Sequence, residues 1–399
     1  MKPRKPYRIL LSGGGTGGHI FPAIAIAREI GNIQPGTEFL FVGALGKMEM
    51  EQVPRAGFRI VGLPVSAFHR RLTFKNLLFP FRLAASLLKA SGIIRRFGPD
   101  LVIGTGGFAS GPVLRVATRK GIPCLIQEQN SFPGVTNRLV SARVEKICVA
   151  YPGMEAFFPA GKVVLTGNPV RTDLVIPESR RSQAAAAFGF DPGKATILVF
   201  GGSLGSRTLN KAIHPKVQRL AAEPVQIIWQ TGTSFADEAR KAVSDSGAHN
   251  ITVLDFINNM NEAYAAADLV VCRSGAITLS ELAIVKKPSI LVPLPSAAAD
   301  HQTKNARVYA DAGAAILVPD HEAEKSLVAA LLQLAANPAE LNLMAEKVSA
   351  FAKPDATHTI AELALSLITS HESRITNHES RVTSHESRVT NHELRITNH

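Results

Sequence analysis

Short apolar runs alternate with longer helix-like stretches along almost the whole chain, and this alternation constrains the fold more than any other feature. Strands joined by helical crossovers run parallel, because a parallel pair needs a connection of a dozen or more residues. Each half of the chain also opens with an apolar run that leads directly into a glycine-rich loop. The pattern predicts an α/β protein with two doubly wound, parallel-sheet domains in series.

The expected strands form two groups. Those of the first half are Tyr7–Leu11, Glu38–Val42, Leu101–Thr105, Pro123–Gln127 and Lys146–Val149. Those of the second half are Thr196–Phe200, Val225–Gln230, Ile251–Asp255, Leu269–Cys272, Ser289–Pro293 and Ala315–Val318. We expect domains over residues 1–167 and 168–369, with a last helix near Thr357–Thr369 that packs on either half.

From residue 370 the sequence consists of near-identical seven-residue units, such as NHESRVT and SHESRVT. Each unit has one regular apolar residue, whereas a coiled-coil seam needs two. We therefore expect residues 370–399 to be a low-complexity tail that is exposed and poorly ordered.

Composition narrows the class of protein. Of the 399 residues, 46% are hydrophobic and 19% charged, which is enough apolar material for two cores. No apolar run approaches the roughly 18 residues of a membrane span. The three cysteines, Cys124, Cys148 and Cys272, are too far apart for a disulfide framework or a zinc site and are typical of a reducing cytoplasm.

The net charge of +12 is concentrated in the first half, where residues 1–167 carry 22 basic and 8 acidic side chains. No acid occurs between Glu51 and Asp100, and large apolar residues interleave with the bases. Phe74, Leu77, Leu78 and Phe81 have the spacing of one helix face, with Pro80 as a kink or a helix start. One interpretation is a core helix with a basic polar side; the other is a surface that binds anions. A membrane surface is favoured over nucleic acid, because aromatic residues are few and no nucleic-acid module occurs.

The segment Ser12–His19 follows the first strand and precedes a helix expected near Pro22. Glycines allow backbone N–H groups to approach a phosphate, and a helix N-terminus adds partial positive charge. A nicotinamide site would also need an acid at the end of the second strand, and a Walker loop would need Gly-Lys-Ser/Thr; both are missing. The loop therefore predicts an anion site without a nicotinamide cofactor.

A second loop of the same kind, Gly104–Pro112, follows another strand. Taken alone it fits a tight strand-to-helix turn equally well. Two such loops at the strand ends of one domain favour a shared pocket for a diphosphate or a sugar.

The second half contains Gly201–Arg207, Cys272–Glu281 and Asp300–Asn305. Ser274 is the expected N-cap of a helix whose first N–H groups would face a diphosphate. Glu281 is suited to ribose hydroxyls, or is a solvated helix residue. No DxD pair occurs, so no metal is indicated, and leaving-group charge would fall to helix dipoles and Arg or Lys.

Several motifs, in order, resemble one bacterial glycosyltransferase family. They are GGTGGHIFPAIAIA, IGTGGFASGPV, IQEQNSFPGVTNR, TGNPVR, GGSLGSRTLN, DFINNM, CRSGAITLSELA and DHQTKNA, from about residue 7 to 360. The family adds N-acetylglucosamine (GlcNAc) to lipid I to complete lipid II in peptidoglycan synthesis. The resemblance implies a GT-B fold, with two Rossmann-like domains facing across a cleft. It also implies inverting transfer from UDP-GlcNAc to the muramoyl 4-hydroxyl, without a cofactor or metal.

The resemblance also implies site residues. Donor contacts would be Thr16, Gly17, Gly18, Asn130, Arg171, Ser203, Ile257, Ala276, Ile277, Thr278, Leu279, Ser280, Glu281 and Gln302. Ile257 would hold uracil through its backbone, Glu281 the ribose, Ser203 and Ala276 the diphosphate, and Gln302 and Asn130 the sugar. The base would be His19, which could equally be a structural histidine, with Glu128 as a second candidate.

The family context implies a peripheral position on the cytoplasmic face of the inner membrane, with lipid I as acceptor and other cell-wall synthesis proteins as candidate partners. One departure is Gly43–Glu49, which matches the family stretch GTxxGxE only loosely. The alternatives are another GT-B transferase acting on a lipid acceptor and a non-catalytic nucleotide- or phospholipid-binding module. A nucleic-acid-binding protein comes third.

Overall fold

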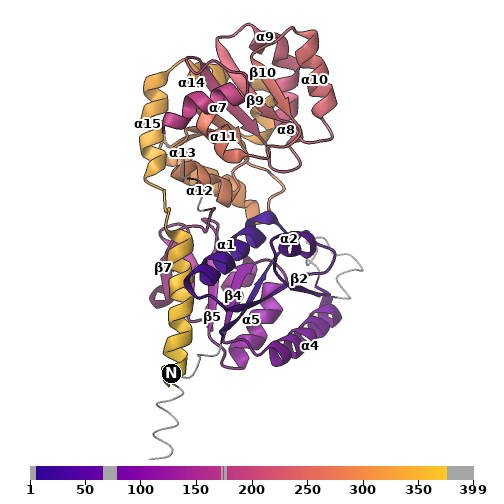
Figure 1. The fold of residues 1–399 in the computed structure, drawn as a ribbon, viewed down its shortest axis with the longest axis vertical. Helices are drawn as coiled ribbons and strands as arrows, with labels where there is room; N and C mark the ends of the chain where they lie inside the picture. Colours follow the sequence, from indigo (N-terminus) through magenta and orange to yellow (C-terminus); the bar gives the residue numbers. More distant parts are fainter. Residues whose placement is uncertain (1–5, 66–78, 172–173, 175–177, 375–399) are drawn as a thin grey trace, which may run out of the picture.

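The computed structural model describes residues 6–65, 79–171, 174 and 178–374. Two lobes lie one above the other along the long axis, each with a parallel sheet covered by helices (Figure 1). The predicted fold class is confirmed: each sheet is doubly wound, with its strand order reversing beside the first strand of its half.

The first sheet has the order β3-β2-β1-β4-β5-β6-β7 and the second β10-β9-β8-β11-β12-β13. The strands of the first sheet are β1 Arg8–Gly13, β2 Glu38–Ala44, β3 Ile60–Leu63, β4 Leu101–Gly106, β5 Cys124–Glu128, β6 Lys146–Val149 and β7 Val163–Leu165. Those of the second are β8 Ala195–Phe200, β9 Val225–Gln230, β10 Ile251–Leu254, β11 Leu269–Cys272, β12 Ser289–Leu291 and β13 Ala315–Leu317. All eleven predicted strands are present; the sequence interpretation missed only β3 and β7, the short edge strands of the first sheet.

The helices cover both faces of each sheet. In the first half they are α1 Gly17–Ile33, α2 Glu49–Arg55, α4 Phe79–Phe97, α5 Ser110–Arg119 and α6 Val135–Val140. In the second half they are α7 Arg181–Ala187, α8 Arg207–Ile213, α9 Val217–Ala221, α10 Ala236–Asp245, α11 Met260–Ala266, α12 Ala276–Ile284, α13 His301–Asp311, α14 Ala323–Ala335 and α15 Pro338–Ser349. A last helix spans residues 356–374.

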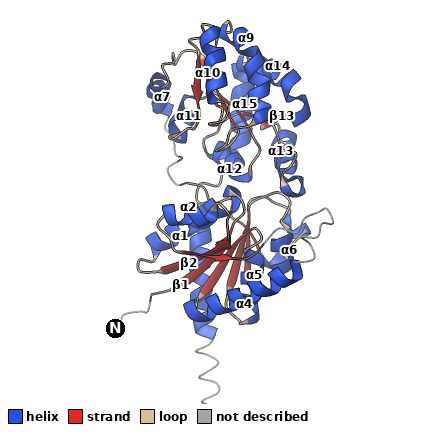
Figure 2. Ribbon diagram, turned by 90° about the vertical axis from the view of Figure 1, so that its right-hand side faces the viewer, coloured by secondary structure: helices blue, strands red, loops and turns tan. Residues whose placement is uncertain are grey.

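The middle of strand β1, Ile9–Leu11, is entirely apolar because both faces of the strand are buried there. Ile9 and Leu11 pack in one core with α1, α2 and the helix over 356–374, whereas Leu10 packs in another with α4, α5 and α6. The second sheet is divided in the same way, with α8, α10 and α14 on one face and α7, α11, α12 and α13 on the other. Figure 2 shows helices on both sides of the strands of the first sheet.

The last helix returns from the second domain to pack on the first (Figure 1). Its buried stripe is Ile360, Ala361, Ala364 and Ile368, at the spacing of one helix face. The helix continues through residues 370–374, so this first part of the predicted disordered tail is instead helical. The remainder of that tail lies outside the described residues.

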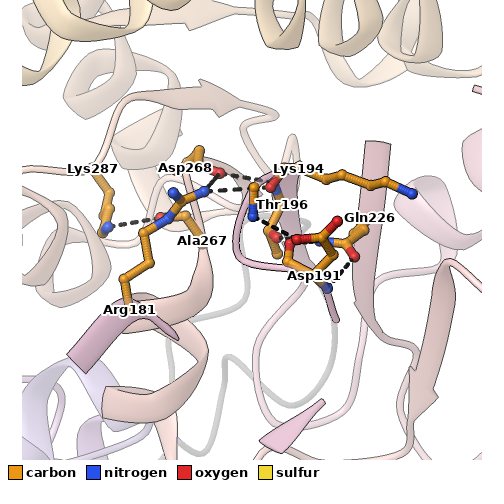
Figure 3. A network of polar contacts seen from close by, with 9 residues as sticks. Arg181, Asp191, Lys194, Thr196, Gln226, Ala267, Asp268 and Lys287 are labelled. Carbon is orange, nitrogen blue, oxygen red and sulfur yellow. Dashed lines mark hydrogen bonds and ion pairs between the residues drawn. The ribbon is translucent and has the colours of Figure 1, made fainter. Parts of the chain in front are cut away.

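A polar network closes the edge of the second sheet that carries the amino ends of its strands (Figure 3). The carboxylate of Asp268, just before β11, accepts hydrogen bonds from the Arg181 guanidinium at 2.7 Å and from the Thr196 backbone N–H at 2.8 Å. Nearby, the Lys287 ammonium donates to the Ala267 carbonyl at 2.7 Å. These contacts connect the amino ends of neighbouring strands, at the edge of the sheet opposite the glycine-rich loops.

Helix α4 covers most of the second half of the acid-free, basic stretch between Glu51 and Asp100. Phe74, Leu77 and Leu78 lie outside the described residues, and Pro80 marks the start of α4 rather than a kink. Phe81 and Leu88 are 73% and 76% exposed, so for these two residues the core-helix interpretation is wrong. Ala90 and Ile94 form the buried side of the same helix.

Among the described residues, no single helix combines the length and the hydropathy of a membrane span. The segments Asp320–Ala335 and Pro338–Ser349 reach that threshold only as a pair bent by 99°.

Candidate active site between the two domains

The two glycine loops of the first domain pack against each other. Strands β1 and β4 are neighbours in the sheet, so the loops that follow them leave the same edge side by side. Gly107 adopts φ +83°, and a Cβ atom there would lie 2.1 Å from the Gly14 carbonyl oxygen. The close approach requires glycine, and it supports the interpretation that the loops share one pocket.

Glu49 holds the first loop in place. Its buried carboxylate accepts hydrogen bonds from the backbone N–H groups of Gly15 and Ala44, both at 3.0 Å. Glu49 belongs to the stretch that matches the family pattern only loosely, yet the loop is well organised around it. The sequence interpretation did not single it out; the signal was an acid directly after the loop that ends β2.

Helix α1 begins at Gly17, five residues before the predicted start near Pro22. Thr16 is the extended N-cap residue, and its carbonyl accepts hydrogen bonds from the N–H groups of His19 and Ile20 at 3.1 and 3.3 Å. Proline favours a first turn, but these two hydrogen bonds start the helix earlier. As a result, Gly17, Gly18 and His19 form the first turn of α1, and the N–H groups of Gly17 and Gly18 precede the first hydrogen bonds within the helix.

A chain of side-chain hydrogen bonds runs from His19 toward the second domain. His19 Nδ1 lies 3.0 Å from Gln129 Oε1, and the Gln129 amide nitrogen donates to the Thr105 carbonyl at 2.9 Å and to the Gln127 side-chain oxygen. The Gln127 amide nitrogen donates to Asn168 Oδ1 at 2.9 Å. The Asn168 amide nitrogen in turn donates to the Ser280 hydroxyl on α12 at 3.0 Å.

Glu128 serves its own loop rather than an open site. The side chain is 1% exposed. Its carboxylate accepts hydrogen bonds from the Asn130 backbone and side-chain N–H groups, both at 3.1 Å, from Gly134 N–H at 3.0 Å and from the Asn137 amide at 2.9 Å. Because both carboxylate oxygens are engaged by donors of this loop and the side chain is buried, the geometry favours a structural role for Glu128 over that of the second base candidate.

The loop after β5 also contacts α13 of the second domain. The buried Asn305 side chain donates to Asn130 Oδ1 at 3.1 Å and accepts from the Ser131 N–H and hydroxyl groups at 2.9 and 3.0 Å. The Lys304 ammonium lies 3.4 Å from the centre of the Phe132 ring, a cation–π contact. Asn305 and Asn168, both missed as site residues, thus connect the two domains beside the predicted sugar contact Asn130.

The start of α12 differs from the prediction. Gly275, not Ser274, is the N-cap residue, and no side chain caps the helix. The buried Ser274 hydroxyl instead donates to the Gln302 carbonyl at 2.8 Å, which ties the start of α12 to α13. The Gln302 side-chain oxygen accepts from the Leu294 N–H at 2.9 Å. The first N–H groups of α12 therefore have no capping side chain, as an anion site requires.

Glu281, on the same helix, is held from two sides. The Tyr264 hydroxyl donates to its Oε2 at 3.0 Å, and Arg171 Nε lies 3.5 Å from its Oε1. Burial, followed by the nearby Glu281 carboxylate, raises the pKa of Tyr264 well above its ordinary value, so the phenol stays a proton donor.

The other predicted donor contacts have different surroundings. Ser203 lies in the exposed loop between β8 and α8. The side chains of Ile257 and Leu279 are buried in the second domain's core, so neither side chain is placed to meet a ligand. The Leu279 backbone is engaged as well, because its N–H donates to the Gly275 carbonyl and its carbonyl accepts from the Tyr309 hydroxyl. A cavity of about 670 Å³ beside the Ser203 loop is lined by Leu204, Arg207, Thr231 and residues of α8 and α10, none of them a predicted donor contact.

His301, at the start of α13, is a further residue that the sequence interpretation missed. Burial lowers its pKa; Glu128 acts in the opposite direction, and His19 and Lys304 lower it further. Among the described residues, no group of three or more His, Cys, Asp or Glu side chains converges as a metal site would require.

Comparisons with known proteins agree on both halves of the chain. Residues 9–149 match the glycosyltransferase family 28 N-terminal domain and residues 196–360 match the C-terminal domain of that family. A relative from Bacteroides fragilis, named UDP-N-acetylglucosamine–N-acetylmuramyl-(pentapeptide) pyrophosphoryl-undecaprenol N-acetylglucosamine transferase, is 48% identical over 362 residues, which cover 90% of this chain and 95% of the relative. A Flavobacterium psychrophilum protein of the same name is 47% identical and covers 92% and 99%.

Solved structures show the same relationship. The crystal structure of MurG from Acinetobacter baumannii superimposes with a TM-score of 0.75 and 30% sequence identity, covering 90% of this chain and 100% of that one. The glycosyltransferase of kitacinnamycin, at 16% identity and a TM-score of 0.63, shares the fold.

Proposed function

The chain belongs to glycosyltransferase family 28, and on that premise we propose that it transfers GlcNAc from UDP-GlcNAc to undecaprenyl-diphospho-muramoylpentapeptide, forming lipid II. The structural observation that supports this proposal most strongly is the hydrogen-bond chain from His19, at the end of the first glycine loop, to Ser280 on α12. It joins the predicted base to the predicted donor helix through residues of both domains. Two relatives that bear this enzyme's name and match over more than nine-tenths of their length support the proposal.

The donor is assigned to the second domain. The uncapped N-terminus of α12 favours the diphosphate, with the Ser203 loop on its other side. Glu281 receives the ribose hydroxyls, and backbone groups at Ile257 receive uracil. Gln302 presents its amide nitrogen to the sugar, because its side-chain oxygen is engaged by Leu294 N–H.

The acceptor is assigned to the first domain. The N–H groups of Gly17 and Gly18, in the first turn of α1, remain donor contacts, as the family resemblance implies. The two packed glycine loops around them favour the acceptor diphosphate. His19 lies in the same turn, so its side chain serves a hydroxyl held beside that diphosphate. Asn130 is oriented by Asn305 from across the domain boundary and by Glu128 from its own loop.

The chemistry then requires a base and a stabilised leaving group. His19 Nε2 takes the proton of the muramoyl 4-hydroxyl as its oxygen attacks C1 of GlcNAc from the face opposite the diphosphate. The bond from C1 to the β-phosphate oxygen breaks, and UDP departs with the negative charge. The dipole of α12 stabilises that charge, and the product carries an inverted, β-1,4 linkage.

A surface of the first domain is assigned to membrane docking on the cytoplasmic face of the inner membrane. On α4, the exposed Phe81 and Leu88 stand among the exposed basic residues Arg82, Lys89, Arg95 and Arg96. Apolar side chains that insert and bases that meet anionic headgroups are the two elements of peripheral binding. The polyprenyl chain of the proposed acceptor stays in the bilayer, so an enzyme that acts on it needs a surface that binds the membrane.

The test is product formation from UDP-GlcNAc and a short-chain analogue of the muramoyl-pentapeptide lipid. Release of UDP with a disaccharide that carries a β-1,4 linkage supports the proposal. Transfer to a diacylglycerol but not to the muramoyl lipid would assign the chain to another acceptor, and UDP-GlcNAc binding without transfer to either would indicate a binding module.

A further inference from the structure

Tyr264 connects three elements of the second domain: α11, on which it lies, the end of β8, and α12. It is on α11, which follows the loop that contains Ile257. Its ring packs edge-on against Phe200, the last residue of β8 before the Ser203 loop, with ring centres 6.3 Å apart. Its hydroxyl reaches Glu281 on α12 at 3.0 Å. One side chain therefore touches the elements assigned to uracil, diphosphate and ribose.

The hydroxyl of Tyr264 has a defined role in this contact. The side chain is fully buried, and a buried phenol without a hydrogen-bond partner is costly. A carboxylate can only accept, so Tyr264 is the donor and Glu281 the acceptor. The bond to a carboxylate is charge-assisted and restricts its rotation more than a neutral hydrogen bond would.

The second contact of Glu281 comes from outside α11. Arg171 follows the linker that contains Asn168, and its Nε lies 3.5 Å from Oε1, whereas Tyr264 holds Oε2. The two contacts fix the plane of the carboxylate.

We propose that Tyr264 is a positioning residue for ribose recognition: its hydrogen bond orients Glu281 so that both carboxylate oxygens meet the 2′- and 3′-hydroxyls of the nucleotide. The inference rests on the proposed function, because that function supplies the ribonucleotide. It makes discrimination against a 2′-deoxynucleotide depend on a tyrosine that does not itself touch the ligand.

The experiment compares the binding of UDP and 2′-deoxy-UDP by calorimetry, with neither acceptor nor turnover. For the wild type we expect UDP to bind about tenfold more tightly, the value of one hydrogen bond to a charged group. Tyr264→Phe should bring the two affinities to within about threefold, mainly by weakening UDP. Glu281→Gln should do the same, and the double variant should fall no further, because both changes remove one interaction.

Tyr309→Phe is the matched control. Tyr309 is also buried, and its hydroxyl also donates to α12, but to the Leu279 carbonyl at 3.2 Å rather than to a carboxylate. It should lose comparable stability and keep the UDP preference. An unchanged preference in Tyr264→Phe, or an equal loss in both tyrosine variants, would overturn the inference.

A crystal structure of the wild type with UDP gives a second test that needs no variant. The inference requires the Tyr264 hydroxyl to stay within hydrogen-bond distance of Glu281 while the carboxylate contacts both ribose hydroxyls; a broken contact overturns it. In these tests, failure of the inference can be distinguished from failure of the proposed function. UDP preference that depends on Tyr264, in a protein that transfers no GlcNAc, would remove the function and retain the inference.

Discussion

His19 Nδ1 lies 3.0 Å from Gln129 Oε1, and this contact fixes which imidazole nitrogen carries the proton. The Gln129 amide nitrogen donates to the Thr105 carbonyl, which can only accept, so the amide oxygen is the atom that faces His19. Nδ1 is therefore the protonated nitrogen, and Nε2 keeps its lone pair. A histidine in this tautomer is prepared to accept a proton before any substrate arrives.

Replacing Gln129 with methionine removes the acceptor for the Nδ1 proton, so His19 should no longer be restricted to that tautomer. We expect kcat to fall about tenfold, because part of the imidazole would carry its proton on Nε2, while KM for UDP-GlcNAc changes little. Nitrogen NMR of labelled histidine reports the tautomer directly. Lower kcat with an unchanged His19 spectrum would show that Gln129 acts only through stability.

Asn305 offers a test of the contact between the domains. In Asn305→Asp one carboxylate oxygen still accepts from Ser131, but the donor to Asn130 is lost; in Asn305→Ala both are lost. We expect KM for UDP-GlcNAc to rise several-fold in both variants, in line with about 1 kcal/mol for one hydrogen bond. Steady-state kinetics with donor varied would show it. An effect in Asn305→Ala alone would assign the role to Ser131 rather than to Asn130.

The pair of His358 with Glu29 makes the docking of the last helix dependent on pH. The hydrogen bond with Glu29, at 2.8 Å, raises the pKa of His358 above its ordinary value. The folded protein thus holds the proton more tightly than the unfolded chain does. The stabilisation is complete below about pH 6.5 and is lost as the pH rises through the raised pKa.

Thermal unfolding at pH 5.5 and pH 8.5 should therefore show a larger loss on alkalinisation for the wild type than for His358→Gln. Glu29→Gln is the matched control, since it leaves the imidazole and removes the nearer of its two carboxylate partners, Glu29 at 2.8 Å and Glu362 at 3.4 Å. Equal pH dependence in all three proteins would contradict the assignment. The exposed position of His358 keeps the expected difference small.

Phe81→Ser combined with Leu88→Ser tests the docking surface. Each side chain is largely exposed, so its insertion into a bilayer would add about 1–2 kcal/mol. We expect binding to anionic liposomes to fall at least about tenfold, with turnover of a short-chain soluble acceptor unchanged. Leu343→Ser, which removes an exposed leucine from α15 in the second domain, should leave liposome binding intact. Undiminished binding of the Phe81 and Leu88 variant would exclude α4 as the contact.

The fold could be predicted from the sequence because strands that are buried on both faces appear as continuous apolar runs. The middle of a strand such as β1 must be apolar on both faces, as Ile9–Leu11 are, and glycines must follow it where two backbones meet, as Gly107 meets Gly14. The missed strands β3 and β7 lie at the sheet edges and consist of only the four residues IVGL and the three residues VVL. Both are apolar, but apolar runs this short do not distinguish a strand from other buried segments.

The site was only partly predictable. Thr16, His19, Arg171 and Glu281 belong to motifs with a family resemblance. Gln129, Asn168 and Asn305 belong to the same motifs, but the sequence does not show which side chains they contact. Gln129, Asn168 and Asn305 are amides in polar stretches, and their roles follow from contacts across 39 to 175 positions. Ser274 was a reasonable N-cap by residue type, yet its hydroxyl is drawn to the Gln302 carbonyl because α13 packs against it.

The most direct measurement is transfer of labelled GlcNAc from UDP-GlcNAc to a short-chain muramoyl-pentapeptide lipid by the wild type and His19→Ala, with donor affinity measured in parallel. We predict a β-1,4-linked product for the wild type and a kcat at least about 100-fold lower for the variant, at a donor affinity unchanged within about threefold. Wild-type protein that binds UDP-GlcNAc but forms no product would contradict the assigned reaction, and full activity in His19→Ala would contradict the assigned base.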